Sequence, residues 1–169
     1  AADLGHAVPA CAERVRRGRV VDVTASMEAP YGPEAVLRVV ADLGTYADWL
    51  DIVRSAAPAP PAPGDPGPAW TVVLQAQLGP LRRSKRPRMV RTSGDGAGTV
   101  RFERSETDGR SHSPWVLTAE VRPAASGSQL VMRLHYGGSM WMPLLDRLLA
   151  DEIERSRPRL VEVVGRSAS

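Results

Sequence analysis

The segment WVLTAEVRPAASGSQLVMRLHY, which spans residues 115–136, carries the clearest structural pattern in this sequence. Apolar side chains occupy alternate positions on both sides of a turn at Ser126–Gly127. These positions are Trp115, Leu117, Ala119 and Val121 before the turn and Leu130, Met132, Leu134 and Tyr136 after it. A period of two on either side of a glycine turn is typical of an antiparallel hairpin. We therefore expect two strands with one covered apolar face and one face in solvent.

The same alternation recurs earlier in the chain and predicts an antiparallel meander. The positions that share a face are Val21, Val23, Ala25 and Met27; Trp70, Val72, Leu74, Ala76 and Leu78; and Val100, Phe102 and Arg104. A shorter strand is expected over residues 52–57. The basic segment 82–91 is expected to form one more strand, which lies in solvent and pairs with acidic neighbours such as Glu103.

Helical signals lie at two places. After the first strand, the spacing predicts a helix that opens at Pro33 and is capped by Gly44, and then a second, short helix. Thr45 and Asp48 form the capping pair of that second helix, which contains Trp49 and Leu50. Near the end of the chain, a long amphipathic helix is expected after a cap at Ser139. Its apolar stripe is Trp141, Leu145, Leu148, Ile153, Leu160 and Val164. Pro158 lies inside this helix and is expected to kink it or to end its first section.

Length and composition indicate one domain of ordinary globular type. The chain has 169 residues, of which 43% are hydrophobic and 24% charged, with a net charge of +3. We interpret residues 1–18 as an N-terminal tail, 19–165 as the domain and the proline-rich stretch 58–68 as a surface loop within it. The single cysteine, Cys11, leaves no thiolate cluster for zinc, and no apolar run is long enough to span a bilayer. The expectation is a cytoplasmic protein without a metal.

The order of elements resembles the helix-grip fold of the START-like (SRPBCC) superfamily, in particular its polyketide cyclase/dehydrase-like and lipid-transport-like members. The likeness rests on the Val21–Val23 strand before Pro30, on Tyr46-x-x-Trp49-Leu50 and on the residues 134–138 before the last helix. The resemblance implies an α+β fold in which a curved antiparallel sheet wraps around the long C-terminal helix, with two short helices after the first strand. It also implies a cavity between sheet and helix that holds an apolar or amphipathic small molecule.

Both a filled interior and a hollow one are compatible with the apolar pattern. If the interior is hollow, the predicted ligand-binding residues are Trp49, Trp70, Val72, Leu74, Val100, Phe102, Arg104, Trp115, Leu117, Leu130, Met132, Leu134, Tyr136, Trp141, Leu145 and Leu148. Trp49 and the proline-rich loop are expected to border the entrance. Arg104 shares the covered face. It binds a carboxylate, phosphate or carbonyl of a ligand, forms a salt bridge with Glu106, or reaches solvent at the end of its strand.

The function predicted on this basis is binding of a lipid, polyketide or aromatic compound by a carrier or sensor without a cofactor. Strand parity places none of His6, His112 and His135 in the cavity, which argues against acid–base catalysis. Tyr136 and Arg104 remain the catalytic candidates for the alternative, a polyketide aromatase/cyclase or dehydratase. A second alternative is an interaction or nucleic-acid-binding module. It would use the basic residues of 82–91, but no aromatic residue for base stacking interrupts them, so nucleic acid is disfavoured as a partner.

Overall fold

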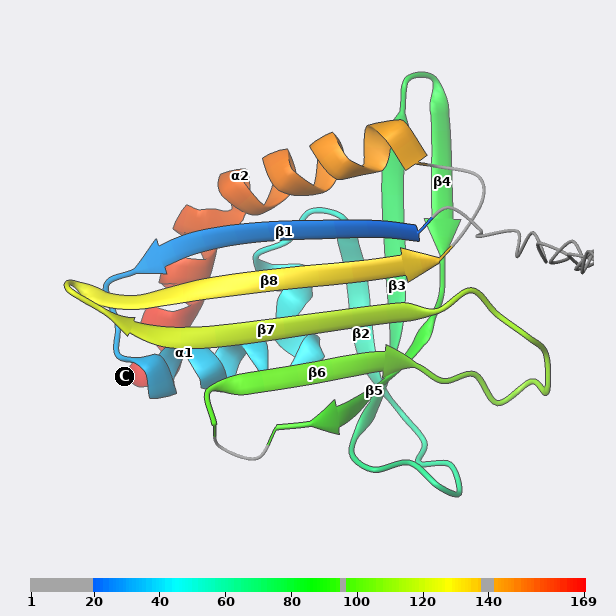
Figure 1. The fold of residues 1–169 in the computed structure, drawn as a ribbon, viewed down its shortest axis with the longest axis horizontal. Helices are drawn as coiled ribbons and strands as arrows, with labels where there is room; N and C mark the ends of the chain where they lie inside the picture. The colour runs from blue at the N-terminus through cyan, green and yellow to red at the C-terminus, as the bar shows by residue number, and fades with distance from the viewer. Residues whose placement is uncertain (1–19, 95–96, 138–141) are drawn as a thin grey trace, which may run out of the picture.

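Eight strands form one antiparallel sheet that curls against the C-terminal helix in the computed structural model (Figure 1). The structure describes residues 20–94, 97–137 and 142–169. Its elements are β1 (Val20–Ala29), α1 (Pro33–Val40), the 3-10 helix η1 (Leu43–Asp48), β2 (Val53–Ala59), β3 (Ala69–Leu78), β4 (Leu81–Lys85), β5 (Arg88–Ser93), β6 (Thr99–Arg104), β7 (Trp115–Ala124), β8 (Gly127–Gly137) and α2 (Met142–Ala168). This is the α+β helix-grip arrangement that the sequence predicts.

The strand order is β1-β8-β7-β6-β5-β3-β2, and each neighbouring pair is antiparallel. The predicted hairpin of residues 115–136 is formed by β7 and β8. Leu117 lies opposite Leu134 and Ala119 lies opposite Met132. Because paired residues of a sheet point to the same face, the apolar rows of successive strands combine into one continuous inner face.

The basic segment is two strands and not one. β3 pairs with β5 through Ala69–Thr71 and with β4 through its other half, Leu74–Leu78. Pro87 lies between β4 and β5, and its carbonyl accepts a hydrogen bond from Val72 N at 3.0 Å. Because proline has no N–H to continue a strand ladder, the pairing with β3 is interrupted at this point. It continues beyond the proline in the same register, with Leu74 opposite Lys85 and Thr71 opposite Arg88. All of β4 is exposed as expected, whereas β5 begins with three buried residues, Arg88–Val90.

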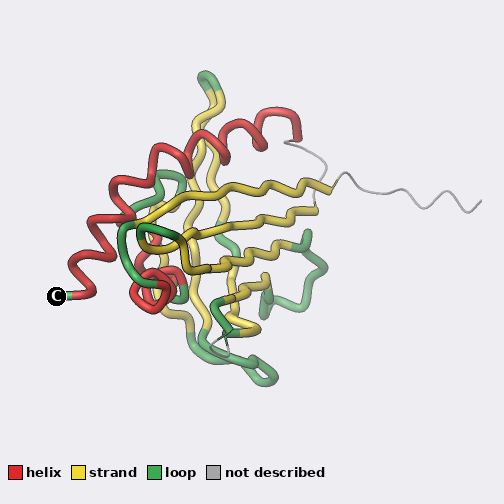
Figure 2. Tube along the Cα trace, turned by 60° about the vertical axis from the view of Figure 1, so that its left-hand side comes forward, coloured by secondary structure: helices red, strands yellow, loops and turns green. Residues whose placement is uncertain are grey.

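The core lies between the inner face of the sheet and the helices. Both helices lie on the same side of the sheet (Figure 2), and α2 packs along β1. The buried helical residues are Val36, Val39 and Val40 of α1 and Leu160, Val163 and Val164 of α2. α2 continues through Pro158 as one helix, so the proline does not end a first section. The predicted cap at Ser139 lies outside the described residues.

The connection between α1 and the sheet differs from the prediction. Gly44 is not the C-cap of α1, because the helix already ends at Val40 with Ala41 as its cap. Asp42 instead caps η1 by accepting a hydrogen bond from Gly44 N at 2.8 Å, so the capping pair of Thr45 and Asp48 is also wrong. Side chains of η1 take over the role of a C-cap. The Thr45 and Tyr46 hydroxyls donate to the last carbonyls of α1, those of Val39 at 2.9 Å and Val40 at 2.8 Å.

The proline-rich stretch is bound firmly to the rest of the domain. Its first two residues belong to β2, which extends to Ala59. In the loop that follows, the Asp65 carboxylate accepts two hydrogen bonds from the Arg88 guanidinium, at 2.6 and 3.2 Å. Arg88 also donates to the carbonyls of Pro60 and Ser105 and is 8% exposed. Hydrogen bonds to charged groups are stronger than neutral ones, so this cluster holds the loop against β5.

Candidate functional site: an apolar cavity

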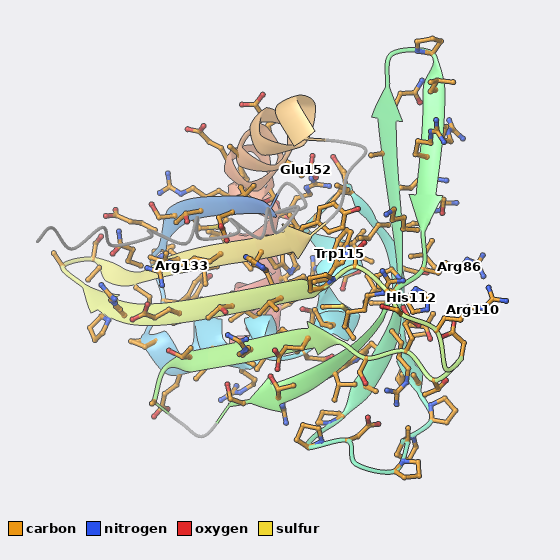
Figure 3. The ribbon with its side chains drawn as sticks, turned by 45° about the vertical axis from the view of Figure 1, so that its right-hand side comes forward. Arg86, Arg110, His112, Trp115, Arg133 and Glu152 are labelled. Atoms are coloured by element: carbon orange, nitrogen blue, oxygen red, sulfur yellow. The ribbon has the colours of Figure 1, made fainter. Side chains whose placement is uncertain are left out.

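A cavity lies between the inner face of the sheet, η1 and α2. Its volume is about 120 Å³, measured as the space open to the centre of a water molecule. One water needs roughly 10–15 Å³ on this measure, so the described residues leave a hollow among them. The described lining residues are Val23, Leu43, Tyr46, Leu50, Ile52, Val53, Val72, Leu74, Pro87, Met89, Trp115, Leu117, Met132, Leu134, Glu152 and Ile153. Figure 3 shows Trp115 of the sheet and Glu152 of α2, two members of this wall.

The two ionisable side chains of this wall, Tyr46 and Glu152, are hydrogen-bonded to other groups of the protein. The Tyr46 hydroxyl donates to Val40 O at 2.8 Å, and burial raises the pKa of Tyr46 far above its usual range, with a smaller contribution from Asp42. The Glu152 carboxylate accepts hydrogen bonds from Asp51 N at 2.5 Å and from the Arg155 guanidinium at 3.1 Å. Neither group is arranged as a general acid or base within the described wall.

A smaller cavity of about 60 Å³ adjoins the first. Its described lining is Ile52, Leu74, Ala76, Arg83, Ser84, Lys85, Trp115 and Tyr136, and the first cavity shares Ile52, Leu74 and Trp115. The Trp115 and Tyr136 rings are in edge-to-face contact, with centroids 4.6 Å apart. Lys85 Nζ donates to Tyr136 Oη at 2.9 Å. The combined space thus has an apolar main part and a polar, basic end.

Seven of the predicted ligand-binding residues line these cavities. They are Val72, Leu74, Trp115, Leu117, Met132, Leu134 and Tyr136, all on strands of the sheet. Their side chains belong to the alternating inner rows of β3, β7 and β8. The register places Leu117 opposite Leu134 and Trp115 opposite Tyr136, whereas β3 is separated from β7 by β5 and β6 and meets them across the curled sheet. The alternation therefore identified much of the sheet side of the cavity.

Five other predicted residues lie in the packed core and line neither cavity: Trp49, Trp70, Val100, Phe102 and Leu130. Trp49 does not border an entrance, because it is 0% exposed and packs against Tyr46 with ring centroids 4.8 Å apart. Phe102 makes an edge contact with Trp70 at 5.7 Å. These aromatic residues fill the part of the interior beside the cavity. Trp141 lies outside the described residues, as do the side chains of Leu145 and Leu148.

Arg104 lies outside both cavities. Its guanidinium forms an ion pair with Glu106 at 2.6 Å and also donates to the Ser113 carbonyl. A nitrogen of His112 lies 3.2 Å from it. The predicted salt bridge with Glu106 is the arrangement observed. Its position removes Arg104 from the catalytic candidates and leaves Tyr136, which lines the smaller cavity.

Several lining residues were not predicted. The sequence contains a signal for Glu152, because Glu152, Ser156 and the predicted apolar residue Leu160 follow one another at a spacing of four and so share one face of the helix. All three are buried. Lys85 lies opposite Leu74 and Arg83 lies opposite Ala76, so both point to the inner face. The sequence gives no comparable signal for Leu43 and Tyr46, which depend on the 3-10 geometry of η1.

The described residues contain no group of histidine, cysteine and carboxylate side chains placed to hold a metal ion. Among these residues, no helix combines the length and apolar character that crossing a membrane requires.

Comparison with known proteins gives the family. The family model described as polyketide cyclase / dehydrase and lipid transport matches residues 20–165. No curated protein matches this sequence. Solved structures with the same fold include TTHA0849 from Thermus thermophilus, which is 21% identical with a TM-score of 0.69; the alignment covers 88% of this chain and 100% of that one.

Two more distant structures share the fold. The di-domain ARO/CYC StfQ of the steffimycin biosynthetic pathway is 12% identical with a TM-score of 0.62, over 90% of this chain and 53% of that one. Ara h 8.0201 is 15% identical with a TM-score of 0.56, over 89% and 99%. At these identities the likeness establishes the fold alone. Since the family model covers most of the chain, the protein belongs to the polyketide cyclase/dehydrase and lipid-transport family, within the START-like (SRPBCC) superfamily.

Proposed function

We propose that this protein binds a hydrophobic or amphipathic small molecule, a lipid, polyketide or aromatic compound, as a non-catalytic carrier or sensor. The observation that supports this most is the composition of the cavity wall. Only Tyr46, Trp115 and Glu152 among its described residues carry a polar side-chain atom. Transfer of apolar surface from water to such a wall contributes about 25 cal/mol per Å² before the costs of association.

The choice of a carrier over an enzyme rests on the two ionisable residues of the main cavity. A catalytic acid or base must reach the substrate and change its protonation state near neutral pH. Burial keeps Tyr46 neutral, and its hydroxyl donates a hydrogen bond to the Val40 carbonyl, while Glu152 accepts two hydrogen bonds from protein groups. These contacts stabilise the fold and leave no obvious reactive group in the described wall.

The alternative, a polyketide aromatase/cyclase or dehydratase, has one residue in its favour. Tyr136 lines the smaller cavity, and its hydroxyl accepts a hydrogen bond from Lys85, which leaves its proton available for donation. This alternative predicts steady turnover of a poly-β-ketone mimic that is lost in Tyr136→Phe. A carrier gives no turnover in either protein.

The binding proposal is tested by filling the cavity from the sheet. Leu117 lines it, whereas the next residue, Thr118, points to the opposite face of β7. We expect wild type and the matched control Thr118→Trp to bind an uncharged naphthylamine dye, and Leu117→Trp to bind it at least tenfold more weakly. Circular dichroism and thermal unfolding verify that both variants fold, since overpacking costs about 1–3 kcal/mol. Unchanged dye affinity in folded Leu117→Trp would exclude this cavity as the binding site.

A further inference from the structure

The second cavity differs from the first in its charge. Two cationic side chains, Arg83 and Lys85, contribute to its described lining, and none of the other six lining residues carries a charge. Both cations come from the inner face of β4, where Lys85 lies opposite Leu74 and Arg83 lies opposite Ala76. The position of these charges follows from strand parity, because residues 83 and 85 share the face that points toward the cavity.

Lys85 and Tyr136 present two hydrogen-bond donors at one point. Lys85 Nζ donates to Tyr136 Oη at 2.9 Å and lies 5.2 Å from the centroid of the same ring. An ammonium group has three donors, and a phenol that accepts one hydrogen bond keeps its own proton to donate. Lys85 is exposed at this end, whereas Tyr136 is 3% exposed. A carboxylate placed here would accept from the ammonium and from the hydroxyl together.

Ile52, Leu74 and Trp115 line both cavities, so the two cavities lie side by side. A molecule that spans them would have its apolar part among Leu117, Met132 and Leu134 and its other end beside Lys85. The Glu152 carboxylate of the main cavity is already hydrogen-bonded to Asp51 N and to the Arg155 guanidinium, so the apolar part of the molecule would meet no unpaired charge among the described residues. The distribution of polarity along the combined space is thus that of an amphiphile with one anionic end.

We infer that the ligand is an anionic amphiphile whose carboxylate, or a similar acidic group, binds to Lys85 and Tyr136 while its apolar part fills the main cavity. This inference rests on the proposed function and adds the chemical class of the ligand. Lys85 would bind the acidic group through its positive charge and a hydrogen bond, and Tyr136 would bind it through a hydrogen bond alone. Arg83 adds positive charge to the same face of β4.

Two probes of equal chain length test the inference. Dodecanoate and dodecanol compete with the uncharged naphthylamine dye near neutral pH, where only dodecanoate is charged. We expect dodecanoate to bind about tenfold more tightly than dodecanol in the wild type, a factor that corresponds to about 1.4 kcal/mol. The preference should decrease as salt concentration rises, because Lys85 is exposed to solvent.

Three variants assign the preference to this site. Lys85→Met keeps an unbranched side chain and removes the charge, so it should abolish the preference for dodecanoate while dye binding persists. Tyr136→Phe should reduce the preference about threefold without a change of charge. Arg82→Met is the matched control, because it removes one positive charge from the same strand. Arg82 lies opposite Gln77, on the face of β4 that points away from the cavity. Its preference should equal that of the wild type.

Chemical labelling gives an independent measurement, because Lys85 is the only lysine of the chain. An N-hydroxysuccinimide ester acylates this amine, and peptide mass spectrometry follows the rate. We expect saturating dodecanoate to slow acylation of Lys85 at least fivefold and dodecanol to have little effect.

The outcomes separate the inference from the function on which it rests. Equal affinity for dodecanoate and dodecanol, with the dye bound, would overturn the anionic site and leave the apolar cavity as a binding site. An equal loss of preference in Arg82→Met and Lys85→Met would overturn the assignment to the inner face of β4. Failure of the dye and of both competitors to bind the folded wild type would overturn the proposed function itself.

Discussion

Tyr46→Phe is a substitution whose effect on stability should change sign with pH. The Tyr46 side chain is 2% exposed, and its hydroxyl donates to the Val40 carbonyl at the end of α1. The variant loses this hydrogen bond and leaves a helix-terminal carbonyl without that donor. At neutral pH we expect the free energy of unfolding to fall by about 1 kcal/mol.

Alkaline pH reverses the order of the two proteins. Burial raises the pKa of Tyr46 far above its ordinary value, so the folded protein keeps the phenol neutral, whereas the unfolded chain ionises it at a pH of about 10. The stability that depends on the neutral phenol is therefore complete below about pH 10 and decreases by about 1.4 kcal/mol per pH unit above it. Phenylalanine has no proton to lose. The two stabilities should become equal near about pH 10.6, and at about pH 11 the variant should be about 0.5 kcal/mol more stable.

Urea titrations followed by circular dichroism measure this difference at several pH values between about 7 and about 11. Other groups that titrate in this range affect both proteins equally and cancel in the difference. A constant advantage of about 1 kcal/mol for the wild type up to about pH 11 would refute the reasoning. It would mean that Tyr46 ionises as readily in the folded protein as in the unfolded chain and is not enclosed by α1, η1 and the sheet.

Three further substitutions test the core, the loop and a turn. Phe102→Ala, at a position with 0% exposure between two aromatic rings, should lower the free energy of unfolding by about 3–5 kcal/mol in urea titrations. Hydrogen bonds from Arg88 lower the pKa of Asp65. The carboxylate therefore contributes its full stabilisation above about pH 4, and this stabilisation is lost as the pH falls through the pKa of the folded protein. The stability deficit of Asp65→Asn should be largest near neutral pH and shrink in acid. Gly127→Ala should lower the free energy of unfolding by more than about 1 kcal/mol, because Gly127 has a φ of 144° and a Cβ there would overlap the Ala29 carbonyl. The control is Gly32→Ala, at a φ of −61° with open space around it, which should leave the stability unchanged. Thermal unfolding measures both.

Strand parity made much of the sheet predictable. The pleat places alternate side chains on opposite faces, so the alternation around Leu117 and Leu134 was sufficient to assign them to the inner face. The same parity did not distinguish a cavity wall from a packed core. Phe102 and Leu117 lie opposite each other in β6 and β7, yet Phe102 is packed among aromatic rings and Leu117 lines the cavity. That difference depends on the curvature of the sheet and on where η1 and α2 contact it.

The end of α1 illustrates a second limit. Gly44 stands where a glycine C-cap is common, but the side chain of Asp42, two residues after Val40, offers a competing cap for η1. The hydroxyls of Thr45 and Tyr46 then satisfy the carbonyls that a glycine cap would have satisfied. These contacts involve side chains that fold back on the preceding helix, and a pattern of residue types along the chain does not encode their direction. The basic segment is divided into β4 and β5 because Pro87, which lies between them, has no N–H to donate to the ladder with β3.

The hairpin formed by β3 and β4 has a mechanical consequence. In the described part of the chain β4 is hydrogen-bonded to β3 alone, while the ladder continues from β3 to β5 and onward to β1. The β3–β4 hairpin projects beyond the neighbouring strands as a narrow arm (Figure 1). Arg83, Ser84 and Lys85 of this arm line the smaller cavity, so a tilt of the arm would change the width of that cavity and leave the ladder from β5 to β8 intact.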